Sequence, residues 1–478
     1  MELDPGSRAG SGALRRLARR ALPVLLLLAQ ILLVHQSLTR NGKVRAIRVP
    51  DTASYLKLAQ VKTVEGALTH YRTNGYALLL RLFGWRKLPG RELAIFFLGT
   101  LCLFAGVGAY GRSSWLGLAA ASPLLYGDTL ELLGRIQPDF VSCGFVLVAV
   151  GALLVSIARP RNVAAWVVLV LAVLAAYQCR PATLFVIGWL PVAGWALRAL
   201  RERRLGGAAL RWAAAVAAAT VIPYLAFIGW RQARVGELGL VAFGGYNMSG
   251  LAASLIDEEM LSELEGEHRE LATRIYRRRT LKGWTPYDPA AGSITWFEQY
   301  SPNIWQVSAP VAYARVRQEE AATPPGAAPR YVRLEVNERL GALSKDVIRR
   351  RPAKYLAWVR DANLYGWRQL GGSPWVVWPA AVLAVSSLAL LVGRRRGIVP
   401  AAGEGSRVPE AAGLLLLGGS YFLAYVLLIS LLSFPFSRYY YGTVLLLPSA
   451  LCAAAAALWA TALAGWRGRR AAAAALRV

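Results

Sequence analysis

The sequence predicts an all-α polytopic membrane protein with about ten transmembrane helices. Hydrophobic residues make up 56% of its 478 residues, and charged residues only 17%. Many apolar runs approach or reach the length that crosses the hydrocarbon core of a bilayer, which takes about 20 residues in an α-helix. This composition excludes a soluble globular protein.

The first apolar run covers residues 21–34 and follows a cluster of arginines. It is similar to a signal peptide, but no small-x-small cleavage site follows it, so we expect an uncleaved first span. Further spans are expected at 92–110, 113–127, 140–158, 163–179, 182–200, 210–229, 374–393, 411–433 and 441–465. The run at 113–127 is short and contains Pro123.

The polar segments between these runs divide the chain into three parts. Residues 1–229 form an N-terminal transmembrane module whose first loop, at 39–91, is amphipathic. Residues 230–373 form a long extracytoplasmic segment with helical patterns, and residues 374–478 form the C-terminal transmembrane helices. We expect the long segment to be a compact subdomain rather than a linker.

The net charge of +28 comes from arginines at the ends of the apolar runs. In that position they orient helices and contact anionic lipid headgroups, so we expect membrane lipids as partners and no nucleic acid. Four basic connections, at 159–161, 198–204, 394–396 and 467–470, share one side. The positive-inside rule then predicts two cytoplasmic termini, and the composition suggests a bacterial inner membrane. The first loop also carries basic residues, but the reverse orientation would misplace four loops.

Asp51 directly follows Pro50 in the first outer loop. Pro50 keeps the residue before it extended, and Asp51 can then cap an amphipathic helix. Capping is the ordinary role of an aspartate before a short helix. A carboxylate at the outer edge of the membrane can also act as a general base.

The orientation places Asp128, Glu131 and Asp139 on the same side of the membrane as Asp51. Carboxylates brought together at one edge suit a general base and a partner that positions it or binds a cation. For Asp128 and Glu131 the favoured explanation is that they are solvated loop residues. Asp139 opens a span, where an acid also stabilises the helix N-terminus, so a catalytic and a structural role both stay open.

Arg72, Arg180 and Arg438 adjoin apolar runs on the outer side, where few cations are expected. A guanidinium binds phosphate through a planar pair of N–H donors, so the phosphate of a membrane-anchored lipid would suit these residues. The alternative is that they reach to lipid headgroups as surface anchors.

Four short stretches resemble motifs of the GT-C membrane glycosyltransferases, in the branch of the protein mannosyltransferases and the aminoarabinose transferase that modifies lipid A. Residues 50–55 (Pro-Asp-Thr-Ala-Ser-Tyr) resemble the family's first-loop acid followed by an aromatic residue. Residues 71–79 (Tyr-Arg-Thr-Asn-Gly-Tyr-Ala-Leu-Leu) resemble its Arg-x-Pro-Gly-Tyr-Pro-Leu-Leu pattern. Residues 134–139 resemble its second-loop acid segment, and residues 438–440 (Arg-Tyr-Tyr) its late Arg-Tyr motif.

The resemblance implies an inverting glycosyltransferase, which moves a sugar from a polyprenyl-phosphate donor to a glycan, lipid or protein acceptor on the outer face of the membrane. The implied site has Asp51 as general base and Asp139 orienting its neighbours or the acceptor. In this interpretation Arg72, Arg180 and Arg438 bind the donor phosphate, and Tyr55, Tyr76 and Tyr439 contact substrate.

No cofactor and no metal are expected, because the first loop offers one acid at the motif position and His35, His70 and His268 are widely separated. Two other classes stay open. A transporter or lipid flippase would carry ionisable residues near the middle of the membrane and broken helices, whereas the charges here lie at the edge. A non-catalytic envelope assembly protein would use 230–373 as a binding surface.

Overall fold

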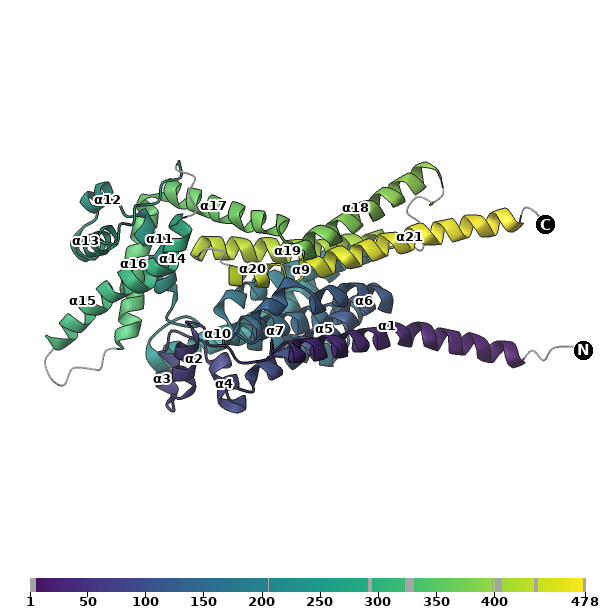
Figure 1. The fold of residues 1–478 in the computed structure, drawn as a ribbon, viewed down its shortest axis with the longest axis horizontal. Coiled ribbons are helices and arrows are strands. Elements are labelled where there is room, and N and C mark those ends of the chain that lie inside the picture. Colours follow the sequence, from purple (N-terminus) through teal and green to yellow (C-terminus); the bar gives the residue numbers. More distant parts are fainter. Residues whose placement is uncertain are drawn as a thin grey trace, which may run out of the picture.

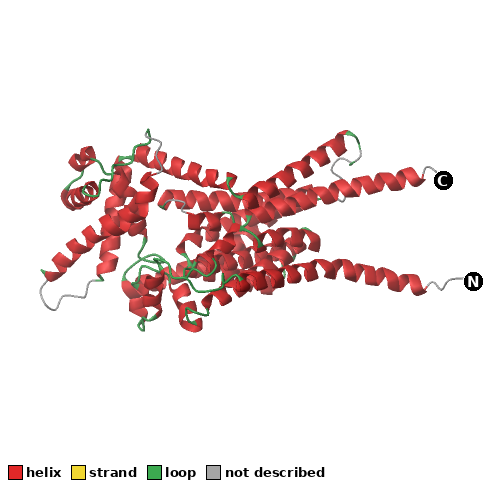
Figure 2. Ribbon diagram, viewed as in Figure 1, coloured by secondary structure: helices red, strands yellow, loops and turns green. Residues whose placement is uncertain are grey.

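The computed structural model describes residues 6–204, 206–290, 295–322, 331–397, 399, 406–433 and 437–475, with main chain only at 6–20, 295, 437–438 and 475. Over this part of the chain the secondary structure is helical, with connecting loops and no strand (Figures 1 and 2). One isolated parallel bridge pairs Ile47 with Arg135. The predicted all-α class is therefore confirmed.

Within the described residues, eight helical segments are long and apolar enough to cross a membrane. The first lies in α1 (Gly6–Arg40), and the last runs from α20 (Ser437–Thr443) into α21 (Leu447–Ala475). Between them lie α5 (Leu88–Tyr110), α7 (Asp139–Ala158), η3 (Pro181–Phe185) with α9 (Val186–Glu202), α10 (Gly207–Val235), α18 (Pro374–Arg395) and α19 (Val408–Leu432). The chain has the architecture of a polytopic helical membrane protein.

Two of the expected spans differ from the other eight. Residues 163–179 form an apolar helix, α8 (Val163–Cys179), of only 17 residues. The run at 113–127 is not one helix, because α6 (Ser114–Ala121) gives way to a 3₁₀ turn, η1 (Ser122–Leu125), that contains Pro123. Proline lacks the N–H that an α-helix needs and its ring clashes with the preceding turn.

Helix α7 lies at the centre of the bundle and packs closely against α5 and α8. A Cβ added at Gly99 of α5 would lie 2.5 Å from the carbonyl oxygen of Gly144, and one at Gly106 would lie 2.6 Å from that of Gly151. Small residues allow transmembrane helices to approach backbone to backbone in this way. Asp139 is the first residue of α7, so the close packing of this helix holds its backbone in place.

The two ends of the molecule differ in architecture (Figure 1). Both termini lie at one end. The first-loop helices α2 (Thr52–Ala59), α3 (Val64–Leu68) and α4 (Asn74–Phe83) lie at the other end, together with the helices that separate α10 from α18. The polar segments therefore gather on one side of the helical bundle.

The segment between α10 and α18 folds as a helical subdomain with its own hydrophobic core, in which Ile304, Leu340 and Trp358 are almost fully buried. Its helices are α11 (Gly244–Leu255), α12 (Glu258–Glu263), α13 (Gly266–Thr280), α14 (Thr295–Pro302), α15 (Ala309–Ala321), α16 (Val332–Arg350) and α17 (Pro352–Gly371), with a π-helical turn, η4 (Asn303–Ser308), between α14 and α15.

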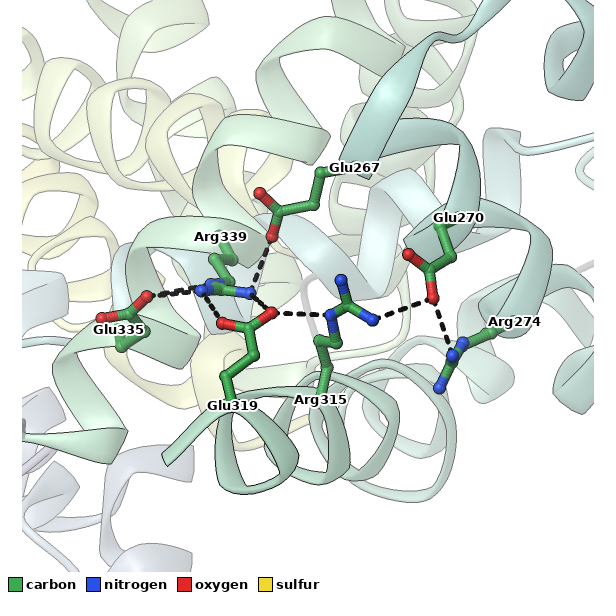
Figure 3. A network of polar contacts seen from close by, with 7 residues as sticks. All are labelled: Glu267, Glu270, Arg274, Arg315, Glu319, Glu335 and Arg339. Carbon is green, nitrogen blue, oxygen red and sulfur yellow. Dashed lines mark hydrogen bonds and ion pairs between the residues drawn. The ribbon is translucent and has the colours of Figure 1, made fainter. Parts of the chain in front are cut away.

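A chain of ion pairs joins α13, α15 and α16 on the surface of this subdomain (Figure 3). Arg339 contacts Glu267 at 2.9 Å, Glu319 at 2.5 Å and Glu335 at 2.7 Å. Arg315 extends the chain to Glu270, which also pairs with Arg274. We call these seven residues the subdomain network: Glu267, Glu270, Arg274, Arg315, Glu319, Glu335 and Arg339.

Candidate active site

A cavity of about 180 Å³ lies at the end of the bundle where the polar segments gather. Its lining comes from the first loop, the start of α7, the turn before α9, the start of the subdomain, the end of α19 and α20. Six residues singled out in the sequence line it: Asp51, Tyr55, Arg72, Asp139, Arg180 and Tyr439. The fold thus brings together residues that are up to 388 positions apart (439 − 51).

Asp51 occupies the N-cap position of α2, but its side chain makes no capping hydrogen bond. Its Oδ1 atom instead accepts a hydrogen bond from Nη2 of Arg72 at 2.5 Å. Nε of Arg72 donates to the Ser54 hydroxyl at 3.1 Å, and its guanidinium lies 5.1 Å from the ring centre of Tyr55. The capping explanation of Asp51 is therefore wrong for this structure, and its carboxylate lies at the cavity.

Hydrogen bonds to the loop that precedes α7 hold the first loop in this position. The Thr52 hydroxyl donates to the carbonyl oxygen of Ile136 at 3.0 Å. Ile47 donates its N–H to Gly134 at 2.7 Å and accepts from the N–H of Ile136 at 2.9 Å. Gly134 has φ +83°, a conformation that glycine adopts without steric cost. Because Ile136 lies three residues before Asp139, these bonds fix the distance between the two acidic segments.

Asp139 and Arg180 form a second ion pair, between Oδ1 and Nη1. Their side chains are only 5% and 7% exposed. The Arg180 guanidinium also lies 4.8 Å from the ring centre of Tyr439. The Thr73 hydroxyl donates to the carbonyl oxygen of Cys179 at 2.8 Å, which ties the chain beside Arg72 to the chain beside Arg180.

The remaining predicted site residues have different positions. Tyr76 is fully buried, packs edge-on against Tyr55 at 5.1 Å between ring centres, and does not line the cavity. It supports Tyr55 rather than reaching substrate in this structure. The main chain of Arg438 belongs to α20, but its side chain lies outside the described residues. Substrate contact by Tyr55 and Tyr439 stays a prediction.

The rings of His70 and Tyr71 stack, with their centres 4.6 Å apart. Its Nδ1 accepts a hydrogen bond from the backbone N–H of Arg72 at 3.1 Å. Burial, together with the positive charges of Arg333, Arg72 and Lys57, lowers the pKa of His70 to about 4. At neutral pH the imidazole is therefore uncharged and acts as a fixed acceptor beneath Arg72.

Several lining residues were not predicted. Tyr71 directly precedes Arg72, a proposed phosphate ligand, and this adjacency in the sequence could have predicted that Tyr71 lines the cavity. Phe243 and Asn247 come from the start of the subdomain, and nothing in the local sequence connects them with the first loop. Asn247 begins an Asn-Met-Ser triplet, which has the form of a glycosylation sequon and does not predict a place in this cavity.

A second, larger hollow of about 740 Å³ has a mainly apolar lining, and we call it the apolar groove. It is formed by the first-loop helices together with α7, α8 and α10. Asn74 and Gly75 line it directly after Thr73, and Cys179 lines it directly before Arg180. A Cβ at Gly75 would lie 2.6 Å from the carbonyl oxygen of Gln178, so glycine permits the close contact here. The polar cavity and the apolar groove are therefore built from neighbouring residues of the same two segments.

Among the described residues, no group of three histidine, cysteine or acidic side chains is arranged to hold a metal ion. Comparison of the chain with protein-family models, with curated proteins and with solved structures finds no match. The assignment of function therefore depends on the geometry of the cavity and on the residues that line it.

Proposed function

We propose that this protein is an inverting glycosyltransferase of the GT-C type, which moves a sugar from a polyprenyl-phosphate donor to an acceptor at the outer face of a bacterial inner membrane. The observation that carries the proposal is one cavity lined by Asp51, Arg72, Asp139 and Arg180. Two carboxylates and two guanidiniums beside an apolar groove match an amphiphilic substrate with a phosphate between its sugar and its lipid chain.

The two arginines supply the phosphate site. Each guanidinium carries five N–H donors in a planar arrangement that matches phosphate oxygens. Arg72 and Arg180 come from separate segments that meet through the Thr73 to Cys179 hydrogen bond. When a phosphate lies between the two arginines, the first isoprene units of its lipid chain can occupy the neighbouring apolar groove, which Asn74 and Cys179 help to line.

Asp51 is the proposed general base. A donor phosphate competes with its carboxylate for Arg72, so donor binding loosens the ion pair and leaves Asp51 ready to accept a proton. The acceptor hydroxyl then gives its proton to Asp51, and its oxygen bonds to the anomeric carbon on the face opposite the phosphate. The bond from the anomeric carbon to the phosphate oxygen breaks with its electron pair, which releases polyprenyl phosphate stabilised by the arginines.

Asp139 has a positioning role in this mechanism. It is buried against Arg180 at the start of the central helix α7, so it fixes the direction of that guanidinium. A buried charge pair of this kind is costly to desolvate and gives little net stability, which favours a role in orienting a ligand group. Asp139 is thus proposed to act on the phosphate through Arg180, whereas Asp51 accepts the proton of the acceptor hydroxyl.

Sugar transfer by the purified protein in nanodiscs tests the proposal. The donors are polyprenyl monophosphates that carry single hexoses, pentoses or amino sugars, and the acceptors are extracted envelope glycans, lipids and proteins. We expect one donor to lose its sugar to an acceptor fraction with inversion and with release of polyprenyl phosphate. Absence of transfer and of donor binding across the panel would contradict the proposal.

The proposed orientation has a separate test in a variant without Cys102, Cys143, Cys179 and Cys452. A thiol at exposed Ser262 of α12 is expected to react with a membrane-impermeant maleimide on intact cells. A thiol at exposed Arg161, between α7 and α8, is expected to react only after the membrane is opened. The reverse pattern would put the cavity in the cytoplasm.

A further inference from the structure

Four aromatic rings meet where the first loop contacts the subdomain. We call them the aromatic cluster: Tyr71, Phe243, Tyr246 and Trp305. All six pairs of ring centres are 5.9 to 6.4 Å apart, within the range of favourable aromatic contacts. The rings come from three separate segments, so the fold rather than local sequence assembles them.

The cluster extends from the cavity to the surface. Tyr246 is buried, Tyr71 and Phe243 are half-buried and line the polar cavity, and Trp305 is 40% exposed. A ligand that lies against Trp305 is therefore close to the cavity wall that Tyr71 and Phe243 form. This arrangement suits a molecule that binds at the surface and extends one end toward Asp51.

Trp305 lies in the π-helical turn η4, an uncommon conformation that is often found at functional sites. Asn303, Ile304, Val307 and Ser308 of this turn are buried in the subdomain. Trp305 and Gln306 are the two exposed residues of the turn. The turn therefore presents a large aromatic ring and an amide outward from a rigid base.

Two guanidiniums border the same rings. Arg72 lies 5.2 Å from the ring centre of Tyr71 and 5.4 Å from that of Phe243, and Arg333 lies 5.6 Å from that of Tyr71. These positive charges oppose a cationic ligand such as a quaternary ammonium group. They also oppose a purely apolar chain, because the arginines would lose hydration without gaining hydrogen bonds.

We propose that the acceptor is a saccharide, one of whose sugar rings stacks on Trp305 while a neighbouring hydroxyl reaches Asp51; this inference rests on the proposed function. The C–H bonds on one face of a sugar ring are weakly positive and are attracted to the negative face of an aromatic ring. The hydroxyls at the edge of the sugar can accept hydrogen bonds from arginine N–H groups. The aromatic cluster and its two arginines offer both kinds of contact.

The test uses the purified full-length protein on an array of oligosaccharides built from neutral hexoses, pentoses and N-acetylhexosamines, with a peptide array beside it. We expect the wild type to bind a subset of the saccharides. Trp305→Ala is expected to weaken that binding at least about tenfold, and Trp305→Phe to retain most of it, because phenylalanine keeps an aromatic face. Trp367→Ala is the matched control, since Trp367 is 45% exposed and packs on Phe422 in another part of the molecule.

A parallel measurement separates this inference from the proposed function. Wild type and Trp305→Ala are both expected to bind undecaprenyl phosphate equally, because Trp305 does not line the phosphate site. Binding of undecaprenyl phosphate without saccharide binding, or saccharide binding that Trp305→Ala leaves unchanged, would overturn the inference and leave the proposed function standing. Peptide binding that depends on Trp305 would also overturn it. Loss of undecaprenyl phosphate binding in the wild type would overturn the proposed function.

Discussion

The polar cavity and the subdomain network both consist of arginines paired with carboxylates, but they enclose very different spaces. The Asp51–Arg72 and Asp139–Arg180 side chains are 5 to 21% exposed and border a cavity of about 180 Å³. The seven side chains of the subdomain network reach 51% exposure, and the space that five of them border is about 10 Å³. Pairs of arginine and carboxylate thus surround a space large enough for a ligand group in the cavity, and no such space in the subdomain network.

This difference separates two uses of ion pairs. Partly exposed pairs between helices contribute modestly to stability, typically up to about 1 kcal/mol each, and need no ligand to explain them. Buried pairs lose more hydration energy than they recover unless further hydrogen bonds compensate. The cavity is lined by one buried pair, Asp139–Arg180, and one partly exposed pair, Asp51–Arg72, and a phosphate ligand would add hydrogen bonds to both guanidiniums. The comparison therefore assigns binding to the cavity and stability to the network.

The largest expected effect is on stability, when Arg180 is replaced by methionine. Arg180→Met leaves the carboxylate of Asp139 buried without its partner, a change that typically costs about 3–5 kcal/mol. Arg274→Met is the matched control, because Arg274 and Glu270 are 44% and 42% exposed and should lose no more than about 1 kcal/mol. Thermal unfolding of both variants in detergent measures the difference. Equal losses would remove the distinction between the two clusters.

The second effect is on turnover. Asp51→Asn keeps the size of the side chain but removes the base, so sugar transfer should fall about a hundredfold or more while thermal stability changes little. Glu319→Gln, the same type of change in the subdomain network, should leave transfer within about twofold of the wild type. Transfer by Asp51→Asn at near wild-type rate would remove Asp51 from the mechanism.

The smallest effect concerns the subdomain network and its dependence on pH. Hydrogen bonds from Arg339 are the main cause that lowers the pKa of Glu319 from 4.5 to about 2. Since the folded state favours the charged carboxylate, the network stabilises the protein above pH 4.5 and loses this contribution as the pH falls toward 2. The difference in unfolding temperature between wild type and Glu319→Gln should therefore be present at pH 7 and shrink below pH 4.5. A difference that does not change with pH would contradict this role of Glu319.

Sequence patterns predicted the membrane class and the meeting of Asp51 and Asp139 at one end of the bundle, because both follow from hydrophobic length and the placement of charges between apolar runs. They could not predict which acid pairs with which arginine, since Asp51–Arg72 and Asp139–Arg180 depend on how loops pack. Asp128 was open to either role; it accepts a hydrogen bond from Ser373 at 2.6 Å and does not line the cavity.

Two other differences have local causes. Tyr76 belongs to the motif at 71–79, which predicted that it contacts substrate. It lies on the buried face of α4 and therefore does not line the cavity. Pro123 divides the run at 113–127, which hydrophobicity alone had marked as a span. The contribution of Phe243 and Asn247 to the cavity depends on contact between the first loop and the subdomain, and periodicity carries no information about such contacts.

The central claim is that the arginines of the cavity bind the phosphate of a polyprenyl-phosphate lipid, and native mass spectrometry with undecaprenyl phosphate tests it without knowledge of the sugar. We expect the wild type to bind this lipid in preference to uncharged undecaprenol. Arg180→Lys should weaken binding at least about tenfold, because lysine lacks the planar pair of donors, whereas Arg339→Lys in the subdomain network should bind like the wild type. Equal binding by the two lysine variants, or no preference for the phosphate over the alcohol, would contradict the claim.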